Sequence, residues 1–509
     1  MFELPLLSLL ITIPLVGAVL VGLARGQDAT GTANNAKTVA LWVSLLTFGL
    51  TLFLFAPATA QGGFQWVEKY PWIPALNIYY HVGVDGLSIM LIALTALLTP
   101  LCIGLSWHSI TRHVKAYLAA FLVLEALVIG VFCALDLVLF YVFWEAMLIP
   151  MFLIIGIWGG EQRIYATLKF FLFTLVGSVL MLVALVYIFL ATGVFDLTLL
   201  PEAAFSPTVQ LWLFAAFFVA FAVKIPMWPL HTWLPDAHVQ APTAGSVMLA
   251  GILLKLGAYG FLRIALPILP EAAVQAAPLM MGLSVVAILA TAWIALRQQD
   301  MKKLIAYSSV SHMGFVTLGI FAFTEASLQG AIMQLLNHGV VSAALFMLVG
   351  CLYDRLHTRD LAQMGGVAAV MPHYGLLFLF FTMAAVALPG TNNFIGEFLV
   401  LVGSFPTASW AVVLAVLGVV FGAAYMLRLY KVALLGPAVL PSVQALTDLT
   451  RRELWLFAPL VALTLWCGLQ PQPVLNLTQP VVQRLLAAVQ PMPLVAPAES
   501  APTLEEAPQ

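Results

Sequence analysis

Residues 242–264 read PTAGSVMLAGILLKLGAYGFLRI and decide the fold class of the chain. An α-helix needs about 20 predominantly apolar residues to cross a bilayer, and this stretch has that length. Lys255 lies at its centre, where a charge costs about 2.5–3.5 kcal/mol on insertion scales. The stretch therefore predicts a membrane-spanning helix whose lysine is paired, hydrated or functional.

The rest of the chain has the same apolar character. Its 509 residues are 63% hydrophobic and 8% charged, with a mean hydropathy of +1.05. A soluble globular protein carries roughly 25% charged residues, so this chain has too few charges to cover a water-facing surface. A net charge of −2 and a pI near 6.5 exclude a nuclease or transcription factor, which needs a basic patch. We expect an all-α polytopic membrane protein without a nucleic-acid partner.

Hydropathy predicts about 14 crossings. The predicted spans cover residues 3–24, 38–58, 84–106, 116–134, 137–157, 168–191, 209–228, 242–264, 278–297, 302–322, 327–352, 375–401, 408–430 and 454–470. The first span lacks the basic leader and the small-residue cleavage site of a signal peptide, so we expect it to remain as a span.

Loops that contain several lysines and arginines alternate along the chain with loops that contain almost none. One side holds Arg25, Lys37, Arg112, Lys115, Arg163, Arg297, Lys302, Lys303, Arg355, Arg359, Arg451 and Arg452, and the other holds little besides Lys69 and Arg484. Because positive residues mark cytoplasmic loops, both termini are predicted to face away from the cytoplasm. The Pro/Ala-rich tail over residues 491–509 lacks apolar periodicity and is predicted to be disordered.

Two predicted spans contain matching interruptions. Residues 217–226 read FFVAFAVKIP and residues 380–389 read FFTMAAVALP, a match of F-F-x-x-x-A-V-x-x-P at an offset of 163 residues (389 − 226). The match is short and apolar, so chance similarity stays open. Proline removes a backbone donor and breaks a helix, and paired broken helices in two halves point to the ion path of a transporter.

Charged and titratable residues lie inside several predicted spans. The candidates are Glu145, Lys224, Lys255, His312, His338 and Glu397, with Glu125 as a further candidate. Any one of them can be half of an interhelical pair that only locks the bundle. Structural polar contacts in membranes are usually made by Ser, Thr, Asn and small residues, so the set as a whole favours a proton relay. Histidine titrates near working pH, and burial or a nearby carboxylate switches a lysine between its charged and neutral forms.

Other polar residues have more ordinary interpretations. His231 and His238 flank a short loop where a metal site is conceivable, although core histidines are commoner. Asp85 is expected to be a helix N-cap. Asp136 and Lys169 lie near span ends, where side chains reach the interface.

No motif in the chain predicts a cofactor site. There is no G-x-G-x-x-G after a strand and no Walker A motif. The four cysteines are scattered through apolar runs without CxxC or Cys/His metal spacing, and are interpreted as core residues. We expect this chain to bind no nucleotide, metal or iron–sulfur cluster of its own.

Three stretches carry a resemblance to a known family. They read KIPMWPLHTWLPDAHVQAPTAGSVMLAGILLKLGAYGFLR (224–263), LIAYSSVSHMGF (304–315) and LPGTNNFIGEF (388–398). They resemble the antiporter-like subunits of respiratory complex I, the NADH:quinone oxidoreductase, over nearly the whole chain. Glu397 makes the resemblance one to the subunit M type, because the related L and N subunits place a lysine in that twelfth span.

The resemblance implies a fold and a role for each candidate. The implied fold has 14 helices with two inverted five-helix repeats, each with a broken helix. It divides the chain into residues 1–115, 116–264, 278–432 and 433–509, where the two middle segments are the repeats. Glu145 and Lys224 are implied to form a pair, Lys255 to be the central lysine, His312 and His338 to link it onward, and Glu397 to be the exit.

The implied function is proton translocation in a bacterial inner membrane, by a translocase subunit with no redox centre of its own. FMN, iron–sulfur clusters and quinone are expected in other subunits of the complex, and the related L and N subunits are expected as neighbours. Three alternatives stay open: a cation/proton antiporter complex, a proton-pumping membrane-bound hydrogenase or formate-linked complex, and a structural scaffold. A structural scaffold would not need this set of titratable residues inside its spans.

Overall fold

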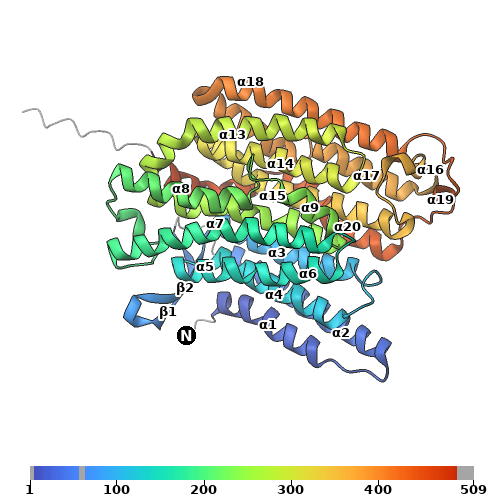
Figure 1. Cartoon of the computed structure of the whole chain (residues 1–509), viewed down its shortest axis with the longest axis horizontal. Coiled ribbons are helices and arrows are strands. Elements are labelled where there is room, and N and C mark those ends of the chain that lie inside the picture. Colours follow the sequence, from blue (N-terminus) through green and yellow to red (C-terminus); the bar gives the residue numbers. More distant parts are fainter. Residues whose placement is uncertain (1–4, 57–62, 490–509) are drawn as a thin grey trace, which may run out of the picture.

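Long helices lying roughly side by side form most of the chain (Figure 1). The computed structural model describes residues 5–56 and 63–489. The helices are α1 (Leu6–Leu23), α2 (Ala29–Thr51), α3 (Gly86–Leu105), α4 (Val114–Cys133), α5 (Leu137–Ala146), α6 (Leu148–Trp158), α7 (Arg163–Thr192), α8 (Pro207–Lys224), α9 (Trp233–Gln240), α10 (Thr243–Met248), α11 (Leu254–Gly260), α12 (Leu266–Ile268), α13 (Pro270–Arg297), α14 (Met301–Phe321), α15 (Glu325–Leu356), α16 (Val367–Val370), α17 (Pro372–Ala385), α18 (Asn392–Leu434), α19 (Pro441–Gln444), α20 (Arg451–Leu469) and α21 (Gln472–Val489). Two π-helical turns, η4 (Leu249–Leu253) and η5 (Phe261–Ala265), join α10, α11 and α12 into one rod.

The prediction of a polytopic all-α membrane protein is confirmed. Thirteen helices of the described chain are long and apolar enough to cross a membrane. One of them, α18, merges two helices across a kink at Ala408, where the backbone leaves helical geometry (φ −148°, ψ 57°). If the two parts of α18 are counted as separate crossings, the 13 become the 14 that hydropathy predicts. The first of these two crossings also includes α17.

Both predicted interruptions are present as breaks in the helices. The first follows α8, which ends at Lys224 before α9 begins at Trp233. The second separates α17 from α18. At each break a backbone N–H reaches back five residues to a carbonyl, from Met227 to Ala222 (2.8 Å) and from Leu388 to Met383 (3.0 Å). The predicted span 209–228 therefore ends in the first break and the predicted span 375–401 contains the second, because the chain unwinds around each proline.

Two elements at one end of the bundle were not predicted. An antiparallel hairpin pairs β1 (Gln65–Ile73) with β2 (Ile78–Val84), and the amphipathic helix α21 packs against α3, α12, α13 and α15. We call this the hairpin end, and it lies near the N-terminus in Figure 1. The opposite end, where α7 and α14 begin among arginines and lysines, is the basic end. The predicted disorder of residues 491–509 lies outside the described residues.

Four spans form the shielded interior of the bundle. Every residue in the most apolar window of the α10–α12 rod and of α15 is buried, as is 94% of that window in α14 and 83% in α3. The outer spans α7 and α18 bury only 39% of theirs, which suits a face turned to lipid. Lys255, His312 and His338 therefore lie on the helices that are best screened from lipid.

Candidate functional site

The central feature of the interior is a direct contact between Lys255 and His338. Nζ of Lys255 lies 2.8 Å from Nδ1 of His338, and the two side chains are 0% and 2% exposed. The same Nζ donates to the carbonyl oxygen of Ala250 (2.5 Å), which lies in the π-helical turn η4. A π-helical turn shifts backbone hydrogen bonds by one residue and is frequent at functional sites. An ammonium group only donates, so Nδ1 of His338 accepts when Lys255 is charged.

A second buried contact joins His312 to Glu397. Nδ1 of His312 lies 2.7 Å from Oε1 of Glu397, and Nε2 of Gln334 donates to the same oxygen at 3.1 Å. A cavity of about 10 Å³, lined in part by His312, Glu397 and Tyr425, adjoins this contact. Its volume approaches that needed for one water molecule. Sequence reasoning missed Gln334, because a single glutamine in an apolar helix does not reveal its partner.

The two contacts are joined through the histidines. The rings of His312 and His338 are neighbours, with centroids 5.7 Å apart and planes tilted by 51°. Four candidates that are up to 142 residues apart (397 − 255) therefore lie in one row, in the order Lys255, His338, His312 and Glu397. Each of the four is a group that can hold or release a proton.

Lys224 and Glu145 lie near each other without a direct bond. Lys224 is 2% exposed, and its Nζ has no hydrogen-bond partner in the described part of the chain. Instead it lies over the ring of Trp144, 5.1 Å from the centroid, a cation–π geometry. Glu145 is half-buried and close enough to exert a Coulombic effect on Lys224, but no ion pair within 4.0 Å joins the two among residues 5–56 and 63–489.

Packing brings Lys224 close to the rod that carries Lys255. Gly257, two residues beyond Lys255, lies against the end of α8: an added Cβ would approach the carbonyl of Phe221 and the amide of Ile225 within 2.7 Å. Only glycine allows two backbones to come this close.

Glu125 is isolated within the bundle. It is fully buried on α4, and neither carboxylate oxygen has a hydrogen-bond partner among the residues that the structure describes. The structure does not bring it into contact with the row.

His238 is a buried residue that connects this interior to the basic end. It is fully buried, stacks on Phe346 with centroids 4.5 Å apart, and lies within Coulombic range of both Lys255 and Lys302. Lys302 was counted among the basic loop residues, but it begins α14 as a buried side chain and donates to the carbonyl of Ala241 (2.7 Å).

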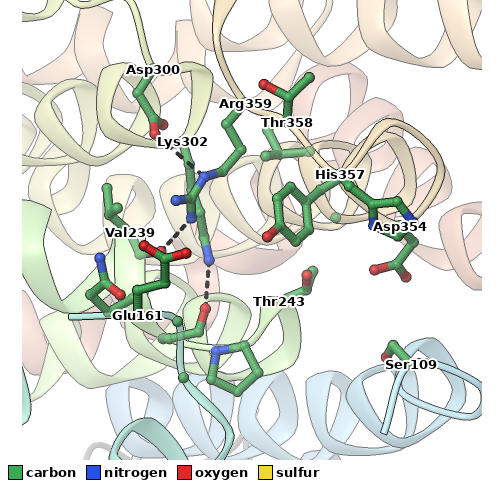
Figure 2. A pocket seen from close by; sticks show the side chains of 18 of the residues that line it. Ser109, Glu161, Val239, Thr243, Asp300, Lys302, Asp354, His357, Thr358 and Arg359 are labelled. Carbon is green, nitrogen blue, oxygen red and sulfur yellow. Dashed lines mark hydrogen bonds and ion pairs between the residues drawn. The ribbon is translucent and has the colours of Figure 1, made fainter. Parts of the chain in front are cut away.

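A cavity of about 1070 Å³ opens beside Lys302 at the basic end. Figure 2 shows Lys302, Arg359 and Asp300 on one side of it, with Thr243 on its wall. Arg359 donates to the carbonyl of Val239 and lies 3.4 Å from Asp300. Ala241, whose carbonyl Lys302 holds, also lines the cavity, so a polar hollow reaches within a few residues of His238.

Asp85 and Lys169 have structural partners. Asp85 is the N-cap of α3, as predicted, and accepts from the backbone N–H of Ser88. Lys169 pairs with Asp236 at 2.6 Å. No cluster of three or more His, Cys, Asp or Glu with metal-binding geometry occurs in residues 5–56 and 63–489.

Comparisons with known proteins show which families share this sequence and this fold. A family model described as NADH:quinone oxidoreductase/Mrp antiporter, TM, matches residues 134–422. NADH-quinone oxidoreductase subunit M of Rhodobacter capsulatus is 52% identical over 495 residues, covering 94% of this chain and 96% of the relative. A chain of respiratory complex I from Thermus thermophilus with bound NADH matches with a TM-score of 0.87 and 33% identity, over 95% of this chain and 100% of that one. A chain of the Mrp complex from Dietzia sp. DQ12-45-1b shares the fold, with a TM-score of 0.81 and 22% identity over 95% of this chain and 52% of that one.

Proposed function

The chain belongs to the NADH:quinone oxidoreductase/Mrp antiporter membrane family, within it to the subunit M group, and we propose that its row of buried titratable side chains carries the protons. It is a proton-translocating membrane subunit of an NADH-quinone oxidoreductase, and hence part of a translocase.

One observation carries this proposal: Lys255, His338, His312 and Glu397 lie in one row, in which hydrogen-bond contacts join the first two and the last two and the two imidazole rings are neighbours. A proton on Lys255 passes to Nδ1 of His338 through their hydrogen bond. A centroid separation of 5.7 Å brings the two imidazoles within reach of a direct or one-water link. His312 then delivers the proton to the carboxylate of Glu397, which acts as the last loading site before release.

Lys224 and Glu145 act upstream of Lys255 in this scheme. Lys224 lacks a direct counter-ion, so a modest approach of Glu145 would strongly favour its charged form, and a retreat would favour the neutral amine. Glu125 is a weaker candidate for the same half, because neither of its carboxylate oxygens has a hydrogen-bond partner among the described residues and only Glu145 lies within Coulombic range of Lys224.

We infer that residues 116–264 and 278–432 are inverted repeats, flanked by residues 1–115 and 433–509. Short backbone bridges join Asp136 to Asp196 and Asp300 to Asp360, at a common offset of 164 residues (300 − 136 and 360 − 196). The first bridge adjoins the hairpin through Tyr79, and the second lines the cavity at the basic end. Equivalent bridges at opposite ends are what an inverted repeat requires.

The setting of the subunit follows from its family. We propose that the complex I L and N subunits flank it and that FMN, iron–sulfur clusters and quinone are held by other subunits. The membrane is then the inner membrane of a bacterium, with the basic end cytoplasmic and the hairpin end outside. The 52% identity to a subunit M, against 22% to the Mrp chain, favours this assignment over a cation/proton antiporter complex.

Substitution of His338 tests the row most simply. His338→Gln keeps a polar side chain of similar reach but removes the titratable ring. In the intact complex reconstituted into vesicles, NADH-driven internal acidification should fall at least tenfold. His373→Gln is the matched control, because His373 is also paired with an acid, Asp448, but its side chain is 66% exposed. Parental pumping by assembled His338→Gln would assign the row a structural role only.

A further inference from the structure

A charged cluster around a buried carboxylate closes the hairpin end of the rod that carries Lys255. Asp85 is 3% exposed and accepts from two guanidinium groups: NH2 of Arg263 at 2.6 Å and NH2 of Arg484 at 2.9 Å. Arg263 lies on η5 and Arg484 on α21, so three elements meet at one carboxylate. The cluster takes no part in the proton row described above.

The cluster is in line with Lys255 along the helix. Lys255 and Tyr259 are four residues apart in α11, which places their side chains on one face, and Arg263 follows in the π-helical turn η5. Nε of Arg263 donates to the hydroxyl of Tyr259 at 3.2 Å. A path from Lys255 straight to the hairpin end would therefore have to pass Tyr259 and then Arg263.

The hydroxyl of Tyr259 has no capacity left for a proton chain. A tyrosine hydroxyl donates one hydrogen bond and accepts at most two. Tyr259 donates to the carbonyl of Phe132 (2.9 Å), accepts from Arg263, and lies 3.1 Å from Oγ of Ser88, which is then the donor. All three positions are occupied by protein groups, so a water wire cannot include this hydroxyl without breaking one of them.

Charge adds a second obstacle at the same place. A guanidinium group stays protonated in proteins and cannot pass a proton on. Burial by itself would raise the pKa of Asp85, but Arg263 and Arg484 hold it below its usual range, so the carboxyl stays ionised. Two permanent positive charges against one negative charge leave the cluster with a net charge of +1, which repels an approaching proton.

The helix α21 holds this arrangement in place. Besides the bond from Arg484, its backbone lies against the start of α3, where an added Cβ on Gly86 would approach the carbonyl oxygen of Leu477 within 1.9 Å. The ring of Phe64 faces both guanidinium groups, 4.9 Å from that of Arg263 and 5.2 Å from that of Arg484. The hairpin segment and α21 thus cover Asp85 and Arg263 from outside, whereas the side chain of Arg484 is 39% exposed.

We propose that Tyr259, Arg263 and Asp85 form a proton barrier at the hairpin end, so that a proton on Lys255 leaves sideways to His338 and not directly out of the membrane. This proposal rests on the proposed role of Lys255 in the row. Asp85 and Arg484 are positioning residues, because they act by holding the guanidinium of Arg263 in line with Tyr259.

The barrier is tested by passive proton flux through the resting complex. The complete complex is reconstituted into vesicles with a pH-sensitive dye inside, and a potassium gradient with valinomycin imposes a membrane potential without NADH. Arg263→Ala should raise the proton flux at least fivefold over the parent. Arg263→Lys replaces the permanently protonated guanidinium with an amine that can release its proton, so its flux should also exceed that of the parent, by less than for Arg263→Ala. The double variant Arg263→Ala/Lys255→Met should lose the extra flux, because the leak starts from Lys255.

Arg355→Ala is the matched control. Arg355 pairs with Glu453 at 2.8 Å near the basic end, so its loss breaks a comparable ion pair without opening the barrier, and the flux should remain parental. If Arg263→Ala does not assemble, Tyr259→Phe frees the partners of the hydroxyl for water and should leak in the same Lys255-dependent way. The barrier proposal is wrong if assembled Arg263→Ala or Tyr259→Phe shows only the parental proton flux, or if the extra flux persists when Lys255→Met is added. NADH-driven pumping by the single variant Lys255→Met tests the row separately from the barrier. Pumping at the parental rate would show that Lys255 is not part of a proton relay, whereas a loss of pumping is the result that the relay predicts.

Discussion

Nζ of Lys255 and Nδ1 of His338 lie 2.8 Å apart in the best-shielded part of the bundle. An ammonium group cannot accept a hydrogen bond, and an imidazole nitrogen accepts only when it is unprotonated. The contact therefore holds a single proton between two groups, and moving that proton reverses which of them is charged. This arrangement is suited to transfer, whereas a purely structural pair would gain more from a permanent charge and a carboxylate.

Loss of Glu145 should impair pumping through Lys224. Glu145→Gln removes the nearest opposite charge of a lysine that has no hydrogen-bond partner among the described residues, so its charged form becomes harder to populate. NADH-driven quinone reduction and proton pumping by the complex should fall together if they are tightly coupled. An assembled variant with both rates unaltered would show that the pair has no part in the relay.

Variants of Glu397 separate the need for a proton carrier from the need for a negative charge. Glu397→Ala removes the group that His312 and Gln334 contact and should reduce pumping strongly, whereas Glu397→Asp should keep part of it. Glu397→Lys keeps a titratable group but reverses its charge, so substantial activity is expected only if proton exchange alone matters. The measurement is vesicle acidification. Parental pumping by Glu397→Ala would contradict the exit role.

Cysteine labelling tests the orientation of the bundle. In a background without the four native cysteines, all of which are buried, Gln299→Cys at the basic end should react only with reagent added from the cytoplasm. Leu76→Cys, at the exposed turn of the hairpin, should react only from the other side. Reaction of Gln299→Cys from outside would reverse the topology and every path drawn on it.

Asp196 should anchor the hairpin in a pH-dependent way. Burial opposes ionisation, but the close contact of His81 Nδ1 (3.1 Å) and hydrogen bonds from Lys69 and Thr198 hold the pKa of Asp196 below its usual range. The resulting stabilisation is therefore present above the unfolded pKa, near 4, and is lost as the pH falls through the lowered folded value.

Asp196→Asn should accordingly speed amide hydrogen exchange in β2 at pH 7 by about tenfold to a hundredfold, which corresponds to about 1.5–3 kcal/mol for a charged hydrogen bond. The difference from the parent should shrink below pH 4. Glu202→Gln, an exposed change in the same loop, is the control. Equal exchange in Asp196→Asn and the parent at pH 7 would exclude the anchor.

Sequence reasoning was strongest where a single physical rule dominates. Apolar length predicted the crossings, proline predicted both breaks, and the polarity of Asp85 predicted a cap. The hairpin was missed because neither β1 nor β2 carries a strict alternation of apolar and polar residues. The helix α21 was missed because its apolar stripe, from Val474 to Val489, was judged against the hydropathy of a membrane span.

The contacts within the row, and which histidine follows Lys255, could not be read from the residues alone. Lys255, His338, His312 and Glu397 come from helices whose relative positions depend on close packing, for example at Gly257. For the same reason the sequence does not predict the contact of Gln334 with Glu397, the cavity beside Lys302 or the three hydrogen bonds of the Tyr259 hydroxyl. Each of these depends on side chains that are far apart in the chain.

Lys255→Arg tests the central claim, that a proton passes through the Lys255–His338 contact. Arginine keeps a positive charge beside His338 but does not release its proton. The measurement is the initial rate of NADH-driven acidification inside vesicles that contain the assembled complex. If the lysine exchanges protons, Lys255→Arg pumps at least tenfold more slowly than the parent, as Lys255→Met does. If Lys255→Arg pumps at the parental rate while Lys255→Met does not, only a fixed charge is needed at this position and the relay is wrong.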